Sequence, residues 1–124
     1  MQLDSHRHEI SREDYWERHC SEQLIELGSL HLSCAANSVK AGEVQIFLRP
    51  MELRLLHFFM THPGEVHPRK RLLKEIWGEW AVVGVRTVDV HIRRLRATLQ
   101  PFGLDSLVRT IHCRGYLFSK SDAH

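Results

Sequence analysis

The sequence predicts an α+β domain in which four short strands come first, three helices follow and a β-hairpin ends the fold. Between residues 24 and 47, apolar and polar residues alternate in short runs that Gly, Asn and Ser interrupt. Apolar residues then recur at every third or fourth position in three stretches as far as residue 99, and two alternating runs flank a short turn near the C-terminus. A period of two is typical of strands, and a spacing of three to four is typical of amphipathic helices.

The N-terminal strands are expected to form an antiparallel sheet, at residues 24–27, 30–32, 39–41 and 44–47. The residues before them, 1–23, are polar and charged and contain neither Gly nor Pro. Ser11 and Asp14 resemble a capping box, which would open a short helix. We therefore expect residues 1–23 to form a polar arm or linker that contains such a helix.

Helix boundaries follow from Pro and Gly. Pro50 suits the first turn of one helix, which the Pro63-Gly64 pair ends. The next two helices are expected at 69–77 and 86–99. The hairpin is expected to pair 107–111 with 116–118, so that the domain covers 24–119 and a short tail covers 120–124.

Composition excludes several classes of protein. With 124 residues, 43% hydrophobic and 26% charged, the chain suits one globular domain. It contains no apolar run near the roughly 18–20 residues of a membrane helix, and its three cysteines, an odd number without a CxxC pair, favour a reducing compartment such as the cytoplasm. It also contains no GxSxG, Walker A, HExxH or paired-carboxylate motif, and its ten histidines and three cysteines form no HxxxH or CxxC pair. We therefore expect neither an enzyme, nor a cofactor, nor a metal site.

Positive charge is concentrated in one part of the chain. The formal net charge is only +2, but residues 1–23 carry −3, and residues 69–114, with ten bases and four acids, carry +6. Such an excess favours a polyanionic partner, of which nucleic acid is the first candidate. A well-solvated basic surface is the alternative.

The third predicted helix concentrates this charge on one face. On a helical wheel its apolar stripe consists of Val88, Ile92, Leu95 and Leu99. The opposite face consists of Arg86, Val90, Arg93, Arg94 and Ala97, while Arg96 flanks the stripe. Arg presents a forked donor that matches guanine or phosphate, and a small apolar side chain suits a thymine methyl. This pattern indicates a helix that reads DNA sequence, with a solvated basic helix as the alternative.

The residues at 86–96, RTVDVHIRRLR, closely resemble the recognition-helix signature of the OmpR/PhoB family of winged-helix response-regulator effector domains. Further motifs of the family stand in order along the chain, at 48–56, at 62–66, at 69–73 with 77–78 and, with Thr110, at 115–118. The resemblance covers about residues 24–119. It implies a winged helix-turn-helix and a sequence-specific transcriptional regulator of a two-component phosphorelay that binds double-stranded DNA. A homodimer on DNA and a monomer both stay open.

The resemblance also implies roles for individual residues, with the third helix in the major groove and the hairpin wing in the minor groove. Five residues are expected to read bases: Thr87, Asp89, Val90, Arg94 and Arg114. Seven are expected to bind phosphates: Arg86, His91, Arg93, Arg96, Thr110, His112 and Tyr116. Such phosphate contacts fix the register on the duplex, whereas base contacts specify the sequence.

The chain departs from the family pattern at several points. His112 and Cys113 stand where the family has Arg and Gly, so we expect Arg114 to be the minor-groove probe and keep His112 as the alternative. Arg49 and Pro68 replace the usual Thr or Ser helix caps. No receiver domain is recognisable in the sequence, which suggests either an excised effector domain or a standalone regulator.

The loop 78–85, before the recognition helix, is apolar at five of its eight positions. In the family this loop can touch RNA polymerase, and we expect such a contact from Glu79, Trp80, Val82 and Val83. The alternative is that these side chains fold back onto the core. Two other functions stay open at this point: a winged-helix module whose basic face binds an acidic protein, and a metal-dependent hydrolase.

Overall fold

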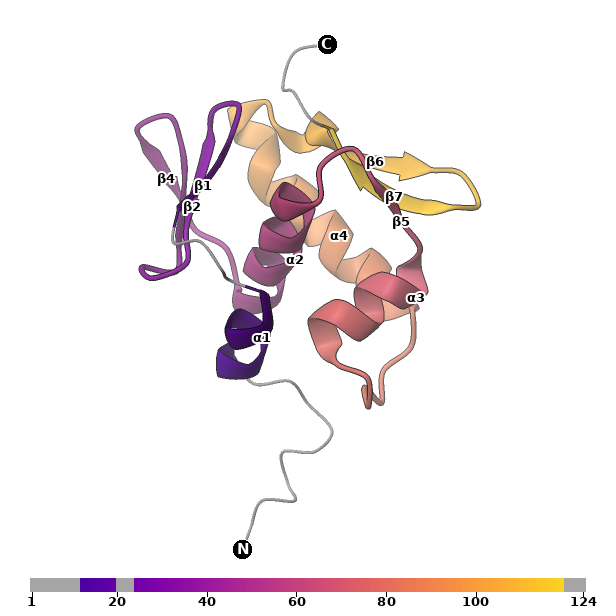
Figure 1. Cartoon of the computed structure of the whole chain (residues 1–124). Helices are drawn as coiled ribbons and strands as arrows, with labels where there is room; N and C mark the ends of the chain where they lie inside the picture. Colours follow the sequence, from indigo (N-terminus) through magenta and orange to yellow (C-terminus); the bar gives the residue numbers. More distant parts are fainter. Residues whose placement is uncertain (1–11, 20–23, 120–124) are drawn as a thin grey trace, which may run out of the picture.

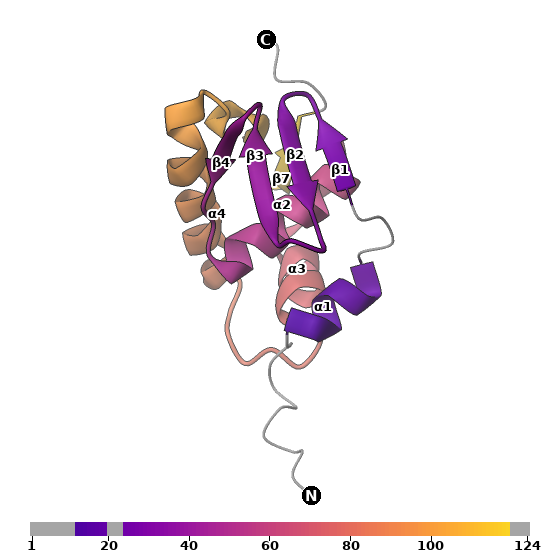
Figure 2. The ribbon, with the colours of Figure 1, turned by 90° about the vertical axis from the view of Figure 1, so that its left-hand side faces the viewer.

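The computed structural model describes residues 12–19 and 24–119 (Figure 1). Helix α1 (Arg12–His19) precedes a four-stranded antiparallel sheet with the strand order β1-β2-β3-β4. Its strands are β1 (Leu24–Leu27), β2 (Leu30–Ser33), β3 (Ser38–Ala41) and β4 (Val44–Ile46). Figure 2 shows this sheet as one layer over α2. The expected order of the N-terminal strands is confirmed.

The helical layer and the wing follow. Helix α2 (Pro50–Thr61) leads to β5 (Val66–His67), to α3 (Arg69–Leu72), which continues as the π-helical turn η2 (Leu73–Trp77), and to α4 (Arg86–Leu99). Two short 3-10 turns, η3 (Gln100–Phe102) and η4 (Asp105–Leu107), connect α4 to the hairpin of β6 (Val108–Ile111) and β7 (Gly115–Phe118). The expected α+β fold, with its sheet, three helices and hairpin, is confirmed.

Two details of this layer differ from the sequence prediction. The predicted helix at 69–77 changes to π-helical hydrogen bonding after Leu72, although it ends before Gly78 as expected. The two-residue strand β5 was not predicted; it pairs with β7 and makes the wing part of a three-stranded sheet with the order β5-β7-β6. A strand of two residues is too short to show an alternating pattern.

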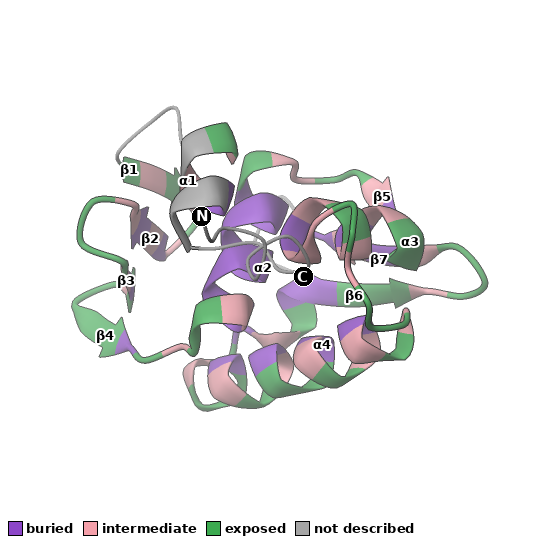
Figure 3. Cartoon of the chain, turned by 90° about the horizontal axis from the view of Figure 1, so that it is seen from below, coloured by how far each residue is buried: buried purple, intermediate pink, exposed green. Residues whose placement is uncertain are grey.

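Helix α2 is the centre of the hydrophobic core. Residues 52–60 are all buried, because the N-terminal sheet covers one side of α2 while η2 and α4 contact it elsewhere (Figure 3). From the sheet, the alternating residues Leu30, Leu32, Val39 and Ile46 point into this core. The sandwiched position explains why α2 is apolar around most of its circumference.

Helix α1 packs against α2 through Tyr15, whose side chain is fully buried. The Tyr15 hydroxyl donates a hydrogen bond to the Arg54 carbonyl oxygen (3.2 Å) and lies 2.9 Å from His57 Nδ1. Arg18 donates to the Glu75 carbonyl oxygen at 3.3 Å. The short helix expected in the arm is therefore present and joined to the domain, whereas Ser11 of the expected capping box lies outside the described residues. None of the helices in the described ranges is long and apolar enough to cross a membrane.

Candidate nucleic-acid interface

Helix α4 buries its apolar stripe and exposes its arginine face. Val88, Ile92, Leu95 and Leu99 are each at most 1% exposed. The residues predicted on the opposite face are all exposed: Arg86, Val90, Arg93, Arg94 and Ala97. Thr87 is half-buried beside them. The helical-wheel prediction is confirmed, and it leaves an outer strip of three arginines and two small apolar residues without an acid.

The wing turn is held in an unusual backbone conformation. The Arg114 amide donates to the Ile111 carbonyl oxygen (2.8 Å), and Cys113 has a left-handed φ of 62°. Cys113 is the third residue of the turn 111–114, and a turn with a positive φ at its third residue favours Gly there. Gly115 follows with φ 138°, and a Cβ atom there would overlap the His67 carbonyl group of β5. The hairpin is thereby fixed closely against β5.

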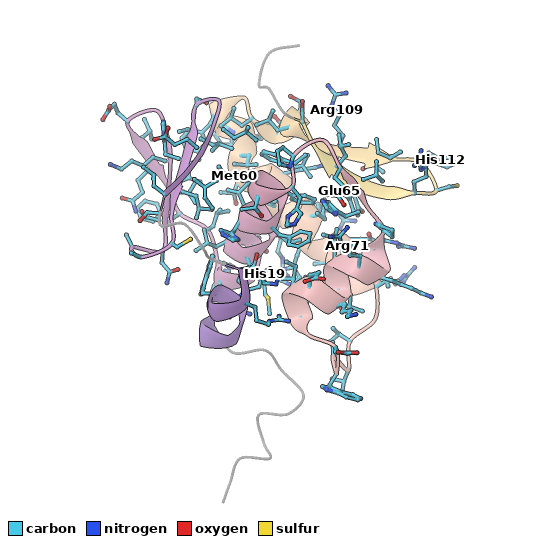
Figure 4. All side chains as sticks on the ribbon, viewed as in Figure 1. His19, Met60, Glu65, Arg71, Arg109 and His112 are labelled. Atoms are coloured by element: carbon cyan, nitrogen blue, oxygen red, sulfur yellow. The ribbon has the colours of Figure 1, made fainter. Side chains whose placement is uncertain are left out.

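The tip of the wing carries exposed cationic and titratable groups. His112, Cys113 and Arg114 are exposed, and Cys113 is a free cysteine. Figure 4 shows Arg109 and His112 on the hairpin, projecting away from the helices. Arg109 was not among the predicted site residues. The signal in the sequence was its charge, because Arg109 is one of the ten bases of residues 69–114. The structure places Arg109 and Thr110 at the two exposed positions of β6.

Arg96 and Thr110, both predicted phosphate ligands, bond to each other. Arg96 Nη2 donates to Thr110 Oγ1 at 2.6 Å, and Arg96 Nε donates to the Val108 carbonyl oxygen at 3.0 Å. The guanidinium carbon also lies 5.6 Å from the centroid of the Tyr116 ring. These contacts link α4 directly to β6 and β7, so they fix the wing relative to the helix.

Asp89 and Tyr116 make a second link. The Tyr116 hydroxyl donates to Asp89 Oδ1 (2.7 Å), while Arg69 Nη1 contacts Asp89 Oδ2 (2.7 Å). Burial, together with the bonded Asp89 carboxylate, raises the pKa of the Tyr116 hydroxyl to about 12, so it stays a donor. Asp89 was predicted to read bases and Tyr116 to bind phosphate; the structure places both in contacts that join α4, α3 and the wing.

His91 points toward the protein rather than to the outer strip. Its Nδ1 lies 2.9 Å from Glu52 Oε2, and its ring packs 5.2 Å from the Trp77 ring. Glu52 is only 2% exposed, at the start of α2. The predicted phosphate ligand His91 thus links α4 to α2 in this structure.

A groove of about 410 Å³ separates the wing from the first turns of α3 and α4. Three bases line it, Arg69, Lys70 and Arg114, together with Asp89 and Cys113. Arg69 and Lys70 were not predicted as site residues, although their charge contributed to the basic segment. The groove gives the space between helix and wing a net positive lining.

The loop before α4 exposes its apolar side chains. Trp80 is 72% and Val82 is 78% exposed, and Val83 and Glu79 are also exposed. The alternative in which Trp80 folds back onto the core does not occur here. Within the described ranges, no three His, Cys, Asp or Glu side chains converge as a metal site would require.

Comparison with known proteins identifies the family. Residues 42–118 match the family model described as "Transcriptional regulatory protein, C terminal". The phosphate regulon transcriptional regulatory protein PhoB of Escherichia coli is 49% identical over 98 residues, which are 79% of this chain and 43% of PhoB. The transcriptional regulatory protein HprR of E. coli is 33% identical, over 82% of this chain and 46% of its own length. The chain therefore spans less than half the length of these curated relatives.

Solved structures agree with the sequence matches. The DNA-binding domain of Klebsiella pneumoniae RstA, solved in complex with the RstA box, is 28% identical, with a TM-score of 0.66 over 80% of this chain and 99% of that one. The Thermotoga maritima response regulator DrrB, described as an OmpR/PhoB homolog, is 27% identical, with a TM-score of 0.69 over 87% of this chain and 49% of that one. The chain belongs to the OmpR/PhoB family of transcriptional regulatory proteins and contains the winged-helix domain that is C-terminal in them.

Proposed function

We propose that this domain is a sequence-specific DNA-binding transcriptional regulator that places α4 in the major groove and the wing in the adjacent minor groove of double-stranded DNA. The observation that carries the proposal is the outer strip of α4, which is exposed, rich in arginine and free of acids. Two sets of bonds hold this strip to the wing, through Arg96 and through Tyr116. RstA, a relative in structure, was solved on its own DNA box. We further propose that the regulator works in the cytoplasm, within a two-component phosphorelay.

The proposed contacts divide into base readers and phosphate ligands. Arg94 and Val90, with Thr87 beside them, read base edges, while Arg86 and Arg93 bind phosphates. Five other predicted DNA-contacting residues first position α4 and the wing through bonds within the protein: Asp89, His91, Arg96, Thr110 and Tyr116. If one of them also contacts DNA, it must share or give up its bond to the protein.

Selection of duplexes from a random pool, followed by titration of arginine variants, tests this division. Arg94→Ala should weaken binding to the selected duplex by about 1–3 kcal/mol and barely change binding to random DNA. Arg86→Ala should weaken both and reduce the slope of log affinity against log salt by roughly one. Equal losses on the two duplexes for Arg94→Ala would remove it from base reading. Selected sites with two half-sites about one helical turn apart would support a homodimer on DNA.

In the wing, we propose that Arg114 is the minor-groove probe. A narrow A·T-rich minor groove attracts an inserted Arg. Arg114→Ala should remove any A·T preference beside the major-groove site, with little dependence on pH. If His112 is the probe instead, His112→Ala should remove that preference and Arg114→Ala should leave it unchanged.

We also propose that the exposed loop of Glu79, Trp80, Val82 and Val83 contacts RNA polymerase. A large exposed apolar patch beside the DNA-reading helix favours a protein partner. Trp80→Ala should lower transcription from a responsive promoter while leaving DNA affinity and the thermal midpoint unchanged. Loss of DNA affinity together with transcription would refute a separate polymerase surface.

A protein-interaction module is the second candidate, since the same basic face would also suit an acidic protein. Sequence preference distinguishes the two, because only a DNA reader prefers one duplex over others by a large factor. Equal affinity for all duplexes, together with tight binding to an acidic protein, would favour the module.

A further inference from the structure

A second groove, of about 420 Å³, lies beside the C-terminal half of α4. Of the predicted DNA-contacting residues, only Arg94 lines it. Its lining comes from α4 and from the segment that leads from β4 into α2: Phe47, Arg49, Glu52, Arg94, Ala97 and Thr98. We call residues 47–49 the connector. Sequence reasoning noted Arg49 only as a missing helix cap, and it assigned Phe47 to a strand.

The connector lies on the other side of α4 from the wing. With 3.6 residues per turn, Asp89 and Arg96, which bond to the wing, lie to one side of the outer strip, and Arg94 and Thr98 lie to the other. The strip around Val90 and Ala97 is therefore flanked twice, by the wing and by the connector. A helix in the major groove has a phosphate backbone on each side, so two flanking elements suit two DNA strands.

The charge of this second groove suits a phosphate. Arg49 and Arg94 are both exposed. The one acid in the lining, Glu52, is 2% exposed, and its Oε2 lies 2.9 Å from His91 Nδ1. The lining therefore carries two arginines against one carboxylate, a net positive charge. An exposed, forked cation such as Arg49 at the rim of a solvent-facing groove favours a phosphate oxygen as its partner, while Arg94 keeps its proposed role in base reading.

Phe47 gives the connector an apolar surface. Its side chain is 81% exposed, the highest value among the large hydrophobic residues of the described chain. An aromatic ring that projects into water at the rim of a basic groove can cover the apolar edge of a deoxyribose when a backbone lies in that groove. The ring and Arg49 together fit a sugar-phosphate chain better than a free anion, which would leave the ring in water.

We propose that the connector is a third DNA-binding element, in which Arg49 binds a backbone phosphate of the strand away from the wing and Phe47 packs on the adjoining sugar. This inference rests on the proposed DNA-binding function and adds a contact beyond the recognition helix and wing. Because phosphates carry no sequence information, the contact adds affinity and fixes the register of α4 in the groove.

The test compares Arg49→Ala with Lys40→Ala, a control that removes one exposed charge from β3 of the neighbouring sheet. On the duplex selected by the unmodified protein, Arg49→Ala should weaken binding about five- to tenfold and lower the salt slope by roughly one. Lys40→Ala should change neither the affinity nor the salt slope, and Arg49→Lys should have the salt slope of the unmodified protein. Equal effects of Arg49→Ala and Lys40→Ala would overturn the proposal, because Arg49 would then contribute only through the net charge of the protein.

Two further measurements locate the contact. Hydroxyl-radical footprinting should show sugars at one edge of the site that the unmodified protein protects and that Phe47→Ala or Arg49→Ala leaves open. Shortening the duplex at that edge should abolish the difference between Arg49→Ala and the unmodified protein, while the effect of Arg114→Ala persists. Unchanged protection in both connector variants would overturn the proposal. Failure of the unmodified protein to select any duplex would instead refute the DNA-binding function itself.

Discussion

The stability of the domain should fall in mild acid because of His57. This side chain of α2 is fully buried, and its Nε2 has no hydrogen-bond partner among the described residues. Burial, and to a lesser degree the neighbouring His19 and His62, lowers the pKa of His57 from its ordinary 6.5 to about 4. The unfolded chain therefore takes up this proton at higher pH than the folded one does. The stabilisation that the domain gains from an uncharged His57 is therefore complete above about pH 6.5 and is lost as the pH falls toward 4.

The magnitude follows from the two pKa values. Between pH 7.5 and 5.0 their difference corresponds to a loss of about 2 kcal/mol in the free energy of unfolding. Urea unfolding at both pH values, followed by circular dichroism, measures this loss in the unmodified protein and in His57→Gln, which cannot take up a proton. The loss should be about 2 kcal/mol smaller in His57→Gln. Burial also lowers the pKa of His19 and His67, and these two remain in both proteins. The same pH dependence in the two proteins would refute the reasoning.

Three further variants test local geometry through the same unfolding measurement. Gly115→Ala should cost at least about 2 kcal/mol, because its Cβ would overlap the His67 carbonyl group; unchanged stability would show that β5 can move away. Cys113→Gly should raise the free energy of unfolding by about 0.5–1 kcal/mol, because it relieves the left-handed backbone strain by more than it adds freedom to the unfolded chain. A lower free energy of unfolding would contradict this. Tyr15→Phe should lower the free energy of unfolding by about 1 kcal/mol, because it removes the hydroxyl that bonds to the Arg54 carbonyl oxygen and lies beside His57 Nδ1. An unchanged value would mean that these polar contacts of α1 contribute little to stability.

Periodicity was sufficient to predict the recognition helix. The structure starts and ends α4 at Arg86 and Leu99, the predicted limits, and the wheel separated buried Ile92 from exposed Arg93 and Arg94. Such features depend on local sequence, because the helical repeat alone decides which side chains share a face. The same holds for the alternation that predicted the N-terminal sheet.

Contacts between distant segments could not be predicted in this way. The bonds of Asp89 to Arg69 and Tyr116 join residues 20 and 27 positions apart, and nothing in the local pattern distinguishes a bonded carboxylate from a free one. The connector groove was missed for the same reason, since Phe47 and Arg94 meet only after folding. Residue types therefore predicted a basic interface. Which of its residues are exposed and which bond to other parts of the protein became known only from the structure.

The bonds from Arg96 to Thr110 and from Tyr116 to Asp89 have a consequence for protein engineering. They join α4 and the hairpin into one rigid unit, so the recognition helix and the wing keep a fixed distance from each other. A recognition helix transplanted from a relative would bring new side chains at its outer strip, yet would seat the wing correctly only if it retained Asp89 and Arg96. A new target sequence can therefore be sought by changing Val90 and Arg94, whereas Asp89 and Arg96, on the side of α4 that faces the wing, have to be kept.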